Sequence, residues 1–295
     1  MKKKTILLTG ASGFLGSYLL ESFIALNFNV IILKRSTSST IRINHLLNNI
    51  IHYNVDLLSS LDDVFVQNKI DIIVHTACSY GRSNESLKEI INTNLIFGIN
   101  LMELGIKFKV QTFINTASLL PRNVNSYSLS KAQLTDWLKV NSSKIQVINL
   151  KIEHMYGPKD DNKKFLPWLI SQMRSGTENI NLTSGIQKRD FIYVDDVVAA
   201  YNLIINNCKK LDNWNEFDIG TNSFINVKDF VIQIAKELEN SHNIKIMPRL
   251  KFGLINYREG DVMIPKLDNS KLLNLGWFPK TSLKEGLKKV LKYNT

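Results

Sequence analysis

The chain is poor in cysteine and has no long apolar run. Only two cysteines, Cys78 and Cys208, occur among its 295 residues, and their spacing matches no metal-ligand or redox motif. Two isolated thiols are typical of a reducing compartment, so we expect both to be reduced and no metal site. No stretch approaches the roughly 20 apolar residues that a membrane-spanning helix needs.

The N-terminal segment lacks the features of a secretion signal. Basic residues do precede an apolar run, but this run stops at Thr9-Gly10, which is too short for the apolar part of a signal. No small-residue cleavage site follows. We therefore expect a cytoplasmic protein with no membrane contact.

Acidic residues are scarce relative to basic ones. The 26 Asp and Glu against 37 Lys and Arg give a formal net charge of +11, which favours an anionic partner. The basic residues are spread along the chain, without a basic tail or alternating aromatic and basic residues. Charge alone does not decide between nucleic acid and the phosphates of a nucleotide ligand, but without those patterns we expect no nucleic-acid partner.

The first half of the chain contains short apolar, β-branched runs that alternate with amphipathic segments, which is typical of βαβ units. The expected strands are Thr5–Thr9, Asn29–Leu33, Ile70–His75, Gln111–Asn115 and Gln146–Leu150, and the main expected helices are Gly13–Leu26, Ser86–Leu104, Ser126–Val140, Val194–Ile205 and Val227–Leu238. We expect an α/β fold with a Rossmann-type doubly wound parallel sheet and a smaller C-terminal α/β substrate lobe. The sheet domain would span 1–157 and about 190–220, and the lobe 158–189 and 221–295.

A glycine turn, Thr9-Gly10-Ala11-Ser12-Gly13-Phe14-Leu15-Gly16, follows the first expected strand and opens a helix. Gly10 permits the tight turn, Gly13 allows the backbone to approach a pyrophosphate, and Gly16 lets the helix pack against the strand. The free N–H groups of the helix N-terminus attract phosphates. This context predicts a dinucleotide site.

The end of the second expected strand lacks the carboxylate that an NAD site places about 20 residues after the glycines. Lys34, Arg35 and Ser36 stand there instead. A cation can pair with the 2′-phosphate of NADP, and a serine can donate a hydrogen bond to it. The sequence thus favours NADPH/NADP+ over NAD, with ordinary solvated surface cations as the alternative.

Tyr127 and Lys131 lie four residues apart, which places them on one face of a helix. A neighbouring ammonium and the positive nicotinamide of an oxidised cofactor would lower the pKa of the phenol from its ordinary value near 10. Ser118, just after the expected strand Gln111–Asn115, could hydrogen-bond the same substrate oxygen. We predict a catalytic Ser118, Tyr127 and Lys131. The alternative is a surface tyrosine with a lysine neighbour.

These features resemble the extended short-chain dehydrogenase/reductase family, the NAD-dependent epimerase/dehydratase group, over nearly the whole chain. The matching motifs are the glycine turn, His75-Thr76-Ala77, Ser118, Tyr127 with Lys131, Tyr156-Gly157-Pro158, Arg189-Asp190-Phe191-Ile192-Tyr193-Val194-Asp195-Asp196 and Leu275-Gly276-Trp277. The family often forms homodimers through the helices expected at Ser86–Leu104 and Ser126–Val140, and we expect the same here.

The resemblance also implies ligand contacts. The cofactor residues would be Gly10, Ser12, Gly13, Phe14, Leu15, Gly16, Lys34, Arg35, Ser36, Asp56, Leu57, Ala77, Asn94, Tyr127 and Lys131. Asp56 and Leu57 would border the adenine, and Asn94 would support Lys131. The substrate residues would be Ser118, His154, Arg189 and Arg258, the two arginines gripping a pyrophosphate. Alternatives are a salt bridge from Arg189 to Asp190 or Asp195, and a packing role for His154.

Departures from the family pattern narrow the range of activities that we expect. Leu119-Leu120 replaces the Asp-Glu of the dehydratases, and the family's usual arginine and asparagine before Tyr-Gly are replaced in the segment 151–158. Together with the segments 77–82 and 182–191, these departures resemble the CDP-abequose and CDP-paratose synthases. We expect NADPH-dependent reduction of the 4-keto group of a nucleotide-activated 4-keto-6-deoxy or 3,6-dideoxy sugar for surface polysaccharide. The alternatives are an NAD(P)-dependent nucleotide-sugar 4-epimerase and a non-catalytic NADP-sensing protein.

Overall fold

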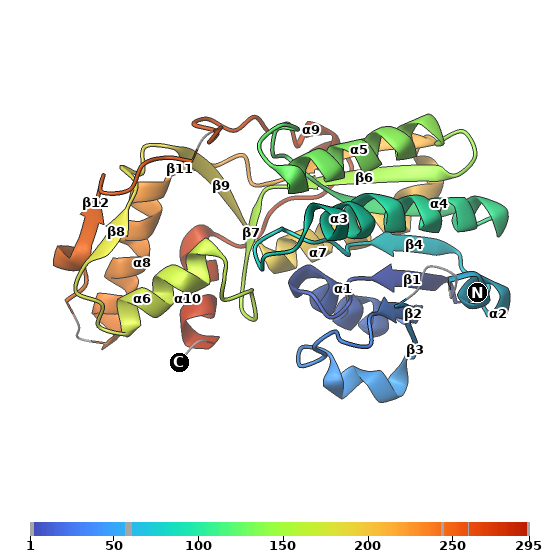
Figure 1. Cartoon of the computed structure of the whole chain (residues 1–295), viewed down its shortest axis with the longest axis horizontal. Coiled ribbons are helices and arrows are strands. Elements are labelled where there is room, and N and C mark those ends of the chain that lie inside the picture. The colour runs from blue at the N-terminus through green and yellow to red at the C-terminus, as the bar shows by residue number, and fades with distance from the viewer. Residues whose placement is uncertain (1–2, 57–60, 243–244, 259, 294–295) are drawn as a thin grey trace. The chain divides into compact units, whose positions relative to one another are not determined.

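The structure is a computed structural model that describes residues 3–56, 61–242, 245–258 and 260–293 (Figure 1). Contacts divide the chain into two compact units. Unit 1 comprises Met1–Ile152 and Val198–Asp218, and unit 2 comprises Glu153–Val197 and Ile219–Thr295. Within the described ranges, no helix has the length and apolar character needed to cross a bilayer.

Unit 1 is built on a seven-stranded sheet with the strand order β10-β6-β5-β4-β1-β2-β3. Its strands are β1 (Thr5–Thr9), β2 (Asn29–Lys34), β3 (Ile51–Asn54), β4 (Ile72–His75), β5 (Thr112–Ser118), β6 (Gln146–Ile152) and β10 (Trp214–Ile219). The strands from β3 to β6 pair in parallel. The order reverses at β1, which lies between β2 and β4, so the expected doubly wound α/β fold is confirmed.

The five strands expected from sequence all form, whereas β3 and β10 were missed. The expected strands are almost continuously buried, as parallel strands covered on both faces should be. β3 lies at one edge of the sheet, and Ile51 is 52% exposed. An edge strand does not need the apolar run by which the inner strands are identified.

Helices cover both faces of this sheet. On one face, α2 (Leu61–Gln67), α4 (Phe97–Lys107) and α5 (Ser126–Val140) share an apolar core with the sheet that includes Leu7, Phe113 and Leu134. On the other, α1 (Phe14–Ala25) and α7 (Val194–Asn207) are joined by a hydrogen bond from Asn202 to Ser22. The helix expected at Ser126–Val140 forms with the same bounds.

The prediction of one regular helix over Ser86–Leu104 was wrong. It consists of α3 (Leu87–Ile91), one π-helical turn (Asn92–Ile96) and α4. The side chain of Asn94, in the π-turn, is fully buried and donates to the Ser79 carbonyl at 2.8 Å and to Ser130 Oγ at 3.0 Å. These tertiary bonds hold the widened turn, and such turns often lie at functional sites.

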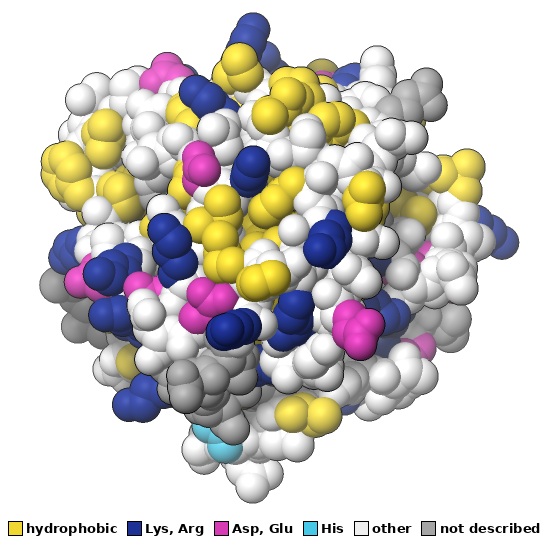
Figure 2. All heavy atoms as spheres, turned by 90° about the vertical axis from the view of Figure 1, so that its left-hand side faces the viewer, with side chains coloured by type: hydrophobic (Ala, Val, Ile, Leu, Met, Phe, Trp, Pro, Cys, Tyr) yellow, Lys and Arg dark blue, Asp and Glu magenta, His cyan; other side chains and the backbone are white. Residues whose placement is uncertain are grey.

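Unit 2 contains a three-stranded sheet and a two-stranded sheet. The first has the order β11-β9-β7, formed by Phe224–Asn226, Lys188–Tyr193 and His154–Tyr156, and the second pairs β12 (Leu250–Phe252) with β8 (Ile180–Leu182). The helices are α6 (Phe165–Arg174), α8 (Val227–His242), α9 (Ser270–Asn274) and α10 (Leu283–Tyr293). On the face shown in Figure 2, Lys and Arg side chains are scattered among apolar ones.

Two of the family-like motifs have a structural role in unit 2. The Trp277 indole N–H donates to the Asp196 carbonyl at 2.9 Å, and the Asp196 carboxylate accepts the backbone N–H groups of Lys280 and Thr281. Both Trp277 and Asp196 are buried. These bonds attach the segment before α10 to the start of α7.

Candidate active site

The glycine turn has the geometry that its sequence predicts. Gly10 has φ +71°, and a Cβ there would lie 2.7 Å from the Ala77 nitrogen. A Cβ on Gly16 would lie 2.0 Å from the Gly10 carbonyl oxygen, so helix α1 can pack against the turn only with glycine at this position. Gly13 precedes α1 and offers no side chain to cap the helix, which leaves its first N–H groups available to an anion.

The other residues of the glycine turn that were predicted to bind the cofactor are Ser12, Phe14 and Leu15. Phe14 and Leu15 begin α1 and are each 7% exposed. Ser12 accepts a hydrogen bond at its carbonyl from Arg42 Nη1, at 3.4 Å. Arg42 was not among the predicted residues, because the sequence pattern directs attention to the end of β2, several positions earlier.

The residues predicted to bind the adenosine end of the cofactor lie together at the adjacent ends of β2 and β3. Asp56 Oδ1 accepts from the Ser36 backbone N–H at 2.9 Å and from Ser36 Oγ at 3.1 Å. Lys34 Nζ donates to Asn54 Oδ1 at 2.6 Å, and Arg35 is exposed. Leu57 lies outside the described residues.

Residues at the end of β4 and just after it lie next to the glycine turn and close to Lys131 of helix α5. The Ala77 N–H donates to Thr9 Oγ1 at 3.3 Å, beside Gly10. His75 is fully buried next to Thr9, and burial, followed by the nearby Lys131 charge, lowers the pKa of His75 to about 3. His75 is therefore neutral at physiological pH. Asn94 was predicted to support Lys131, and its side chain bonds the neighbouring Ser130.

The catalytic helix α5 is fixed at its first turn by a capping box. Asn125 Oδ1 accepts the Ser128 N–H at 2.8 Å, and Ser128 Oγ accepts the Asn125 N–H at 3.1 Å. These two bonds place Tyr127 at the second position of the helix, with Lys131 one turn later. The local sequence thus sets the direction in which both side chains leave the helix.

The three predicted catalytic residues lie in one cluster of unit 1. Tyr127 is hydrogen-bonded to Ser118, at the end of β5. Burial raises the pKa of Tyr127, as does Cys78, whereas the Ser118 hydrogen bond and the Arg82 cation act in the opposite direction. The phenol is therefore protonated at neutral pH and can serve as an acid.

Lys131 is 2% exposed, and its Nζ has no hydrogen-bond partner among the described residues. Burial lowers the pKa of this ammonium. An orphaned buried donor is costly for the folded chain alone, so it indicates a ligand that accepts its hydrogen bonds. Together with the turn and the basic end of β2, Lys131 fits a nicotinamide dinucleotide.

Two further residues of this cluster were missed. The ring of Tyr80 lies on that of Tyr127, with centroids 4.9 Å apart and planes at 34°, and the Arg82 guanidinium lies 5.1 Å from the Tyr80 centroid. The sequence placed both in a segment resembling particular synthases but assigned them no role. The sequence predicted that Lys131 would lower the pKa of Tyr127; in the structure the pKa is raised, and the cation that opposes the rise is Arg82.

The predicted phosphate-gripping arginines belong to unit 2. Arg189 Nη2 pairs with Asp261, and its Nη1 donates to the backbone carbonyls of Lys188 and Val262. The alternative partners Asp190 and Asp195 are therefore wrong. Asp190 is instead fully buried and accepts from Thr221 Oγ1 and the Asn222 N–H.

The other two predicted substrate residues are also in unit 2. Arg258 is exposed, and its carbonyl accepts the Asp261 N–H at 3.1 Å, which places it next to the partner of Arg189. His154 opens β7 and bonds the Glu153 carboxylate at 2.8 Å. Asp261 was not predicted, because only the folded chain brings it against Arg189, and Glu153, the sequence neighbour of His154, was given no role.

Comparison with known proteins agrees with this architecture. Residues 6–220 match the model of the NAD dependent epimerase/dehydratase family. The chain belongs to this family. It is therefore an enzyme of the extended short-chain dehydrogenase/reductase type, whose members bind NAD or NADP.

Among curated proteins, the chain is similar to CDP-abequose synthases from Salmonella. It is 30% identical over 303 residues to that of Salmonella typhimurium strain LT2, covering 98% of both chains. It is 33% identical over 301 residues to that of Salmonella muenchen, covering 98% of this chain and 97% of the relative. Among solved structures, UDP-glucose 4-epimerase from Thermotoga maritima with UDP-glucose superposes with a TM-score of 0.84 at 25% identity, covering 98% of both chains.

Proposed function

We propose that this enzyme uses NADPH to reduce the 4-keto group of a nucleotide-activated 4-keto-6-deoxy or 3,6-dideoxy sugar, in the manner of a CDP-abequose synthase. The product would be a building block for surface polysaccharide such as O-antigen or capsule. The observation that carries this proposal is a partly buried, protonated Tyr127 that is bonded to Ser118 and lies one helical turn from Lys131. The full-length similarity to two CDP-abequose synthases supports the substrate class.

The chain's own residues account for the proton chemistry. NADPH, when bound, supplies the hydride to C4 of the sugar. Ser118 hydrogen-bonds the carbonyl oxygen and stabilises the negative charge that develops there. Tyr127 then gives its phenolic proton to this oxygen, and its raised pKa keeps the proton in place until the charge appears. Lys131 Nζ binds the nicotinamide ribose hydroxyls and stabilises the phenolate that remains.

A reductase explains the residues better than a dehydratase or a non-catalytic sensor does. The dehydratases of this family carry Asp-Glu after the hydroxyl residue that ends strand five, whereas here Leu119-Leu120 offers no proton-transferring group. A 4-epimerase would keep its NAD(H) bound and recycle it. A non-catalytic NADP sensor has no need for Tyr127 or Lys131, and the chain holds both in one cluster.

The proposal is tested by following NADPH oxidation with CDP-, dTDP- and GDP-linked 4-keto-6-deoxy sugars and CDP-4-keto-3,6-dideoxyglucose. We expect stoichiometric oxidation with at least one of them, and NMR should show a 4-hydroxy product. Interconversion of 4-epimers without net NADPH oxidation would favour the epimerase. NADPH binding without turnover of any sugar would favour the sensor.

The cofactor preference makes a separate prediction. We expect NADPH to bind more tightly than NADH, and Arg35→Ala to remove much of the difference, because a charge-assisted pair contributes about 1.5–3 kcal/mol, roughly tenfold to a hundredfold in affinity. Fluorescence titration of both cofactors measures this. Lys144→Ala, which removes an exposed cation after α5, is the control and should leave the preference unchanged. Equal or tighter binding of NADH by the unmodified enzyme would contradict the assignment.

The substrate lobe leads to another testable prediction, which concerns the affinity for the sugar nucleotide. We propose that residues 158–189 and 221–295 bind the nucleotide sugar and that Arg189 and Arg258 hold its pyrophosphate. Either Arg189→Ala or Arg258→Ala should raise KM for the sugar nucleotide about tenfold or more, with NADPH affinity nearly unchanged. Arg189→Lys keeps the charge and should lose less. If NADPH binding weakens as much as substrate binding, the arginines belong to the cofactor site.

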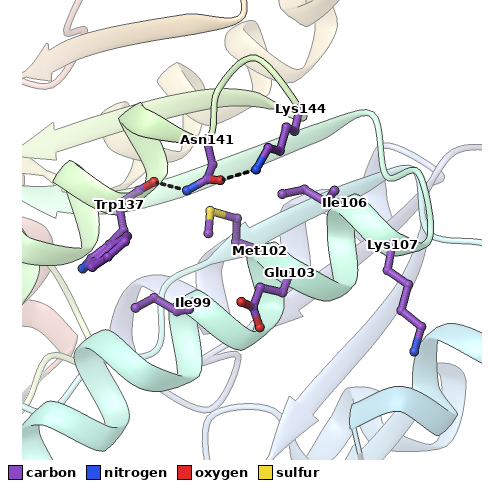
Figure 3. Close-up of a pocket in the computed structure, with 8 residues that line it drawn as sticks. All are labelled: Ile99, Met102, Glu103, Ile106, Lys107, Trp137, Asn141 and Lys144. Carbon is purple, nitrogen blue, oxygen red and sulfur yellow. Dashed lines mark hydrogen bonds between the residues drawn. The ribbon is translucent and has the colours of Figure 1, made fainter.

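We also propose that the enzyme is a homodimer joined through α4 and α5, as in the family it resembles. A groove between these helices is lined by Ile99, Met102, Glu103, Ile106, Lys107, Trp137, Asn141 and Lys144 (Figure 3). Trp137 is 53% and Val140 is 76% exposed on the outer side of α5. A second copy of the same surface would cover these apolar side chains.

A further inference from the structure

One face of the three-stranded sheet in unit 2 carries two of the candidate substrate residues. His154 on β7 is in register with Phe191 on β9, and the two rings contact edge to face with centroids 5.9 Å apart. Because side chains alternate along a strand, Arg189 lies on the same face as Phe191. His154 and Arg189 therefore point to the same side of this sheet from neighbouring strands.

A buried carboxylate holds the His154 ring. Glu153 Oε2 lies 2.8 Å from His154 Nδ1 and accepts the His154 backbone N–H at 3.2 Å. The Glu153 side chain is only 5% exposed, whereas that of His154 is 43% exposed. A buried carboxylate is costly unless its oxygens are hydrogen-bonded, so the His154 ring is fixed by an interaction that Glu153 needs.

The surroundings of Glu153 are shaped for this arrangement. Gly220 lies beside it, and a Cβ on Gly220 would be 3.4 Å from Glu153 Cγ and 2.8 Å from Asp190 Oδ2. The second buried carboxylate, Asp190, has its own donors in Thr221 and Asn222. Each acid thus has separate partners, and the imidazole belongs to Glu153.

The carboxylate determines what the imidazole can bind. An ionised carboxylate only accepts hydrogen bonds, so Nδ1 carries the hydrogen, and in the neutral ring Nε2 is then an acceptor. Phosphate oxygens only accept, so they match Nε2 only in a protonated ring, whereas a hydroxyl both donates and accepts and matches Nε2 in either state. A sugar hydroxyl can donate to Nε2 and does match.

We propose that Glu153 is a positioning residue that presents His154 Nε2 as an acceptor for a hydroxyl group of the sugar, beside the phosphate-binding Arg189. This proposal rests on the proposed function. A 4-keto-3,6-dideoxyhexose linked through C1 keeps one free hydroxyl on its ring, at C2. With the 3,6-dideoxy substrate, the hydroxyl recognised by His154 is therefore the one at C2.

Calorimetric titration with CDP and with CDP-glucose tests the proposal without turnover. His154→Phe keeps the ring packing on Phe191 and should weaken CDP-glucose binding about threefold to tenfold, the contribution of one hydrogen bond, while CDP binding stays unchanged. Glu153→Gln is nearly isosteric and should also weaken CDP-glucose binding, but by less than His154→Phe. The double variant should lose no more than His154→Phe, because Glu153 acts through His154. Arg189→Ala, by contrast, should weaken both ligands.

CDP-2-deoxyglucose extends the test to the C2 hydroxyl. The unmodified enzyme should bind it about as weakly as His154→Phe binds CDP-glucose. If His154→Phe still binds CDP-glucose as much more tightly than CDP as the unmodified enzyme does, the role of His154 is overturned. If His154→Phe loses this gain in affinity and Glu153→Gln loses none of it, the role of Glu153 is overturned. If the unmodified enzyme binds CDP-glucose no more tightly than CDP, there is no sugar subsite and the proposed function fails with it. Melting temperatures confirm that each variant is folded.

Discussion

Tyr127→Phe should lower kcat for sugar reduction by about 10² to 10⁴ while the fold and NADPH binding survive. The substitution keeps the ring that packs on Tyr80 and removes the phenolic proton, the proton that the described cluster offers to the alkoxide. Single-turnover reduction of a 4-keto sugar by enzyme preloaded with NADPH measures this effect, because it isolates the chemical step from product release.

Two neighbouring hydroxyls provide controls for this prediction. Ser118→Ala should cost less than Tyr127→Phe, because it removes a hydrogen bond to the carbonyl oxygen and leaves the acid in place. Tyr80→Phe removes a hydroxyl from the ring that packs at a tilt against Tyr127 and should stay close to the unmodified rate. Unmodified single-turnover kinetics in Tyr127→Phe would mean that another group supplies the proton.

Lys131→Met should weaken NADPH binding at least tenfold and lower kcat about a hundredfold, because one ammonium serves both the ribose hydroxyls and the phenolate. Titration with NADPH and steady-state kinetics give the two values. The apo protein should melt at an equal or higher temperature, because Met replaces a buried ammonium that has no hydrogen-bond partner in the described chain with an apolar side chain of similar length.

This combination separates a ligand-binding lysine from a structural one. A lysine kept for stability would lower the melting temperature when replaced and leave NADPH affinity unchanged in the folded fraction. Such an outcome would contradict the role given to Lys131. Lys139→Met, on the same helix but beside Trp214, is a matched control and should change neither NADPH affinity nor kcat.

Much of unit 1 could be predicted because its signals are local. The inner strands are apolar runs, and α5 begins where Asn125 and Ser128 form a capping box, so the helix with Tyr127 and Lys131 was placed correctly. Gly16 is required by contacts with Gly10 and Ala11 within the turn itself. Edge strand β3 escaped because exposure removes the apolar pattern.

The missed features depend on residues far apart in sequence. The packing of Tyr80 against Tyr127 joins the segment after β4 to the start of α5, and the Arg189–Asp261 ion pair joins β9 to a late loop. No spacing rule identifies such pairs. The π-turn at Asn92–Ile96 is likewise held by bonds from Asn94 to Ser79 and Ser130, which a helical periodicity does not reveal.

The central claim, net hydride transfer from NADPH to C4 of the sugar, is tested most directly with NADPH carrying deuterium at nicotinamide C4, prepared separately as each of the two stereoisomers. The enzyme is mixed with CDP-4-keto-3,6-dideoxyglucose, and the product is examined by NMR and mass spectrometry. With one of the two stereoisomers, we predict one deuterium at sugar C4 for each NADPH consumed, in a single 4-hydroxy epimer. A product without deuterium from either stereoisomer, or sugar epimerised at C4 while the NADPH remains unconsumed, would contradict the account.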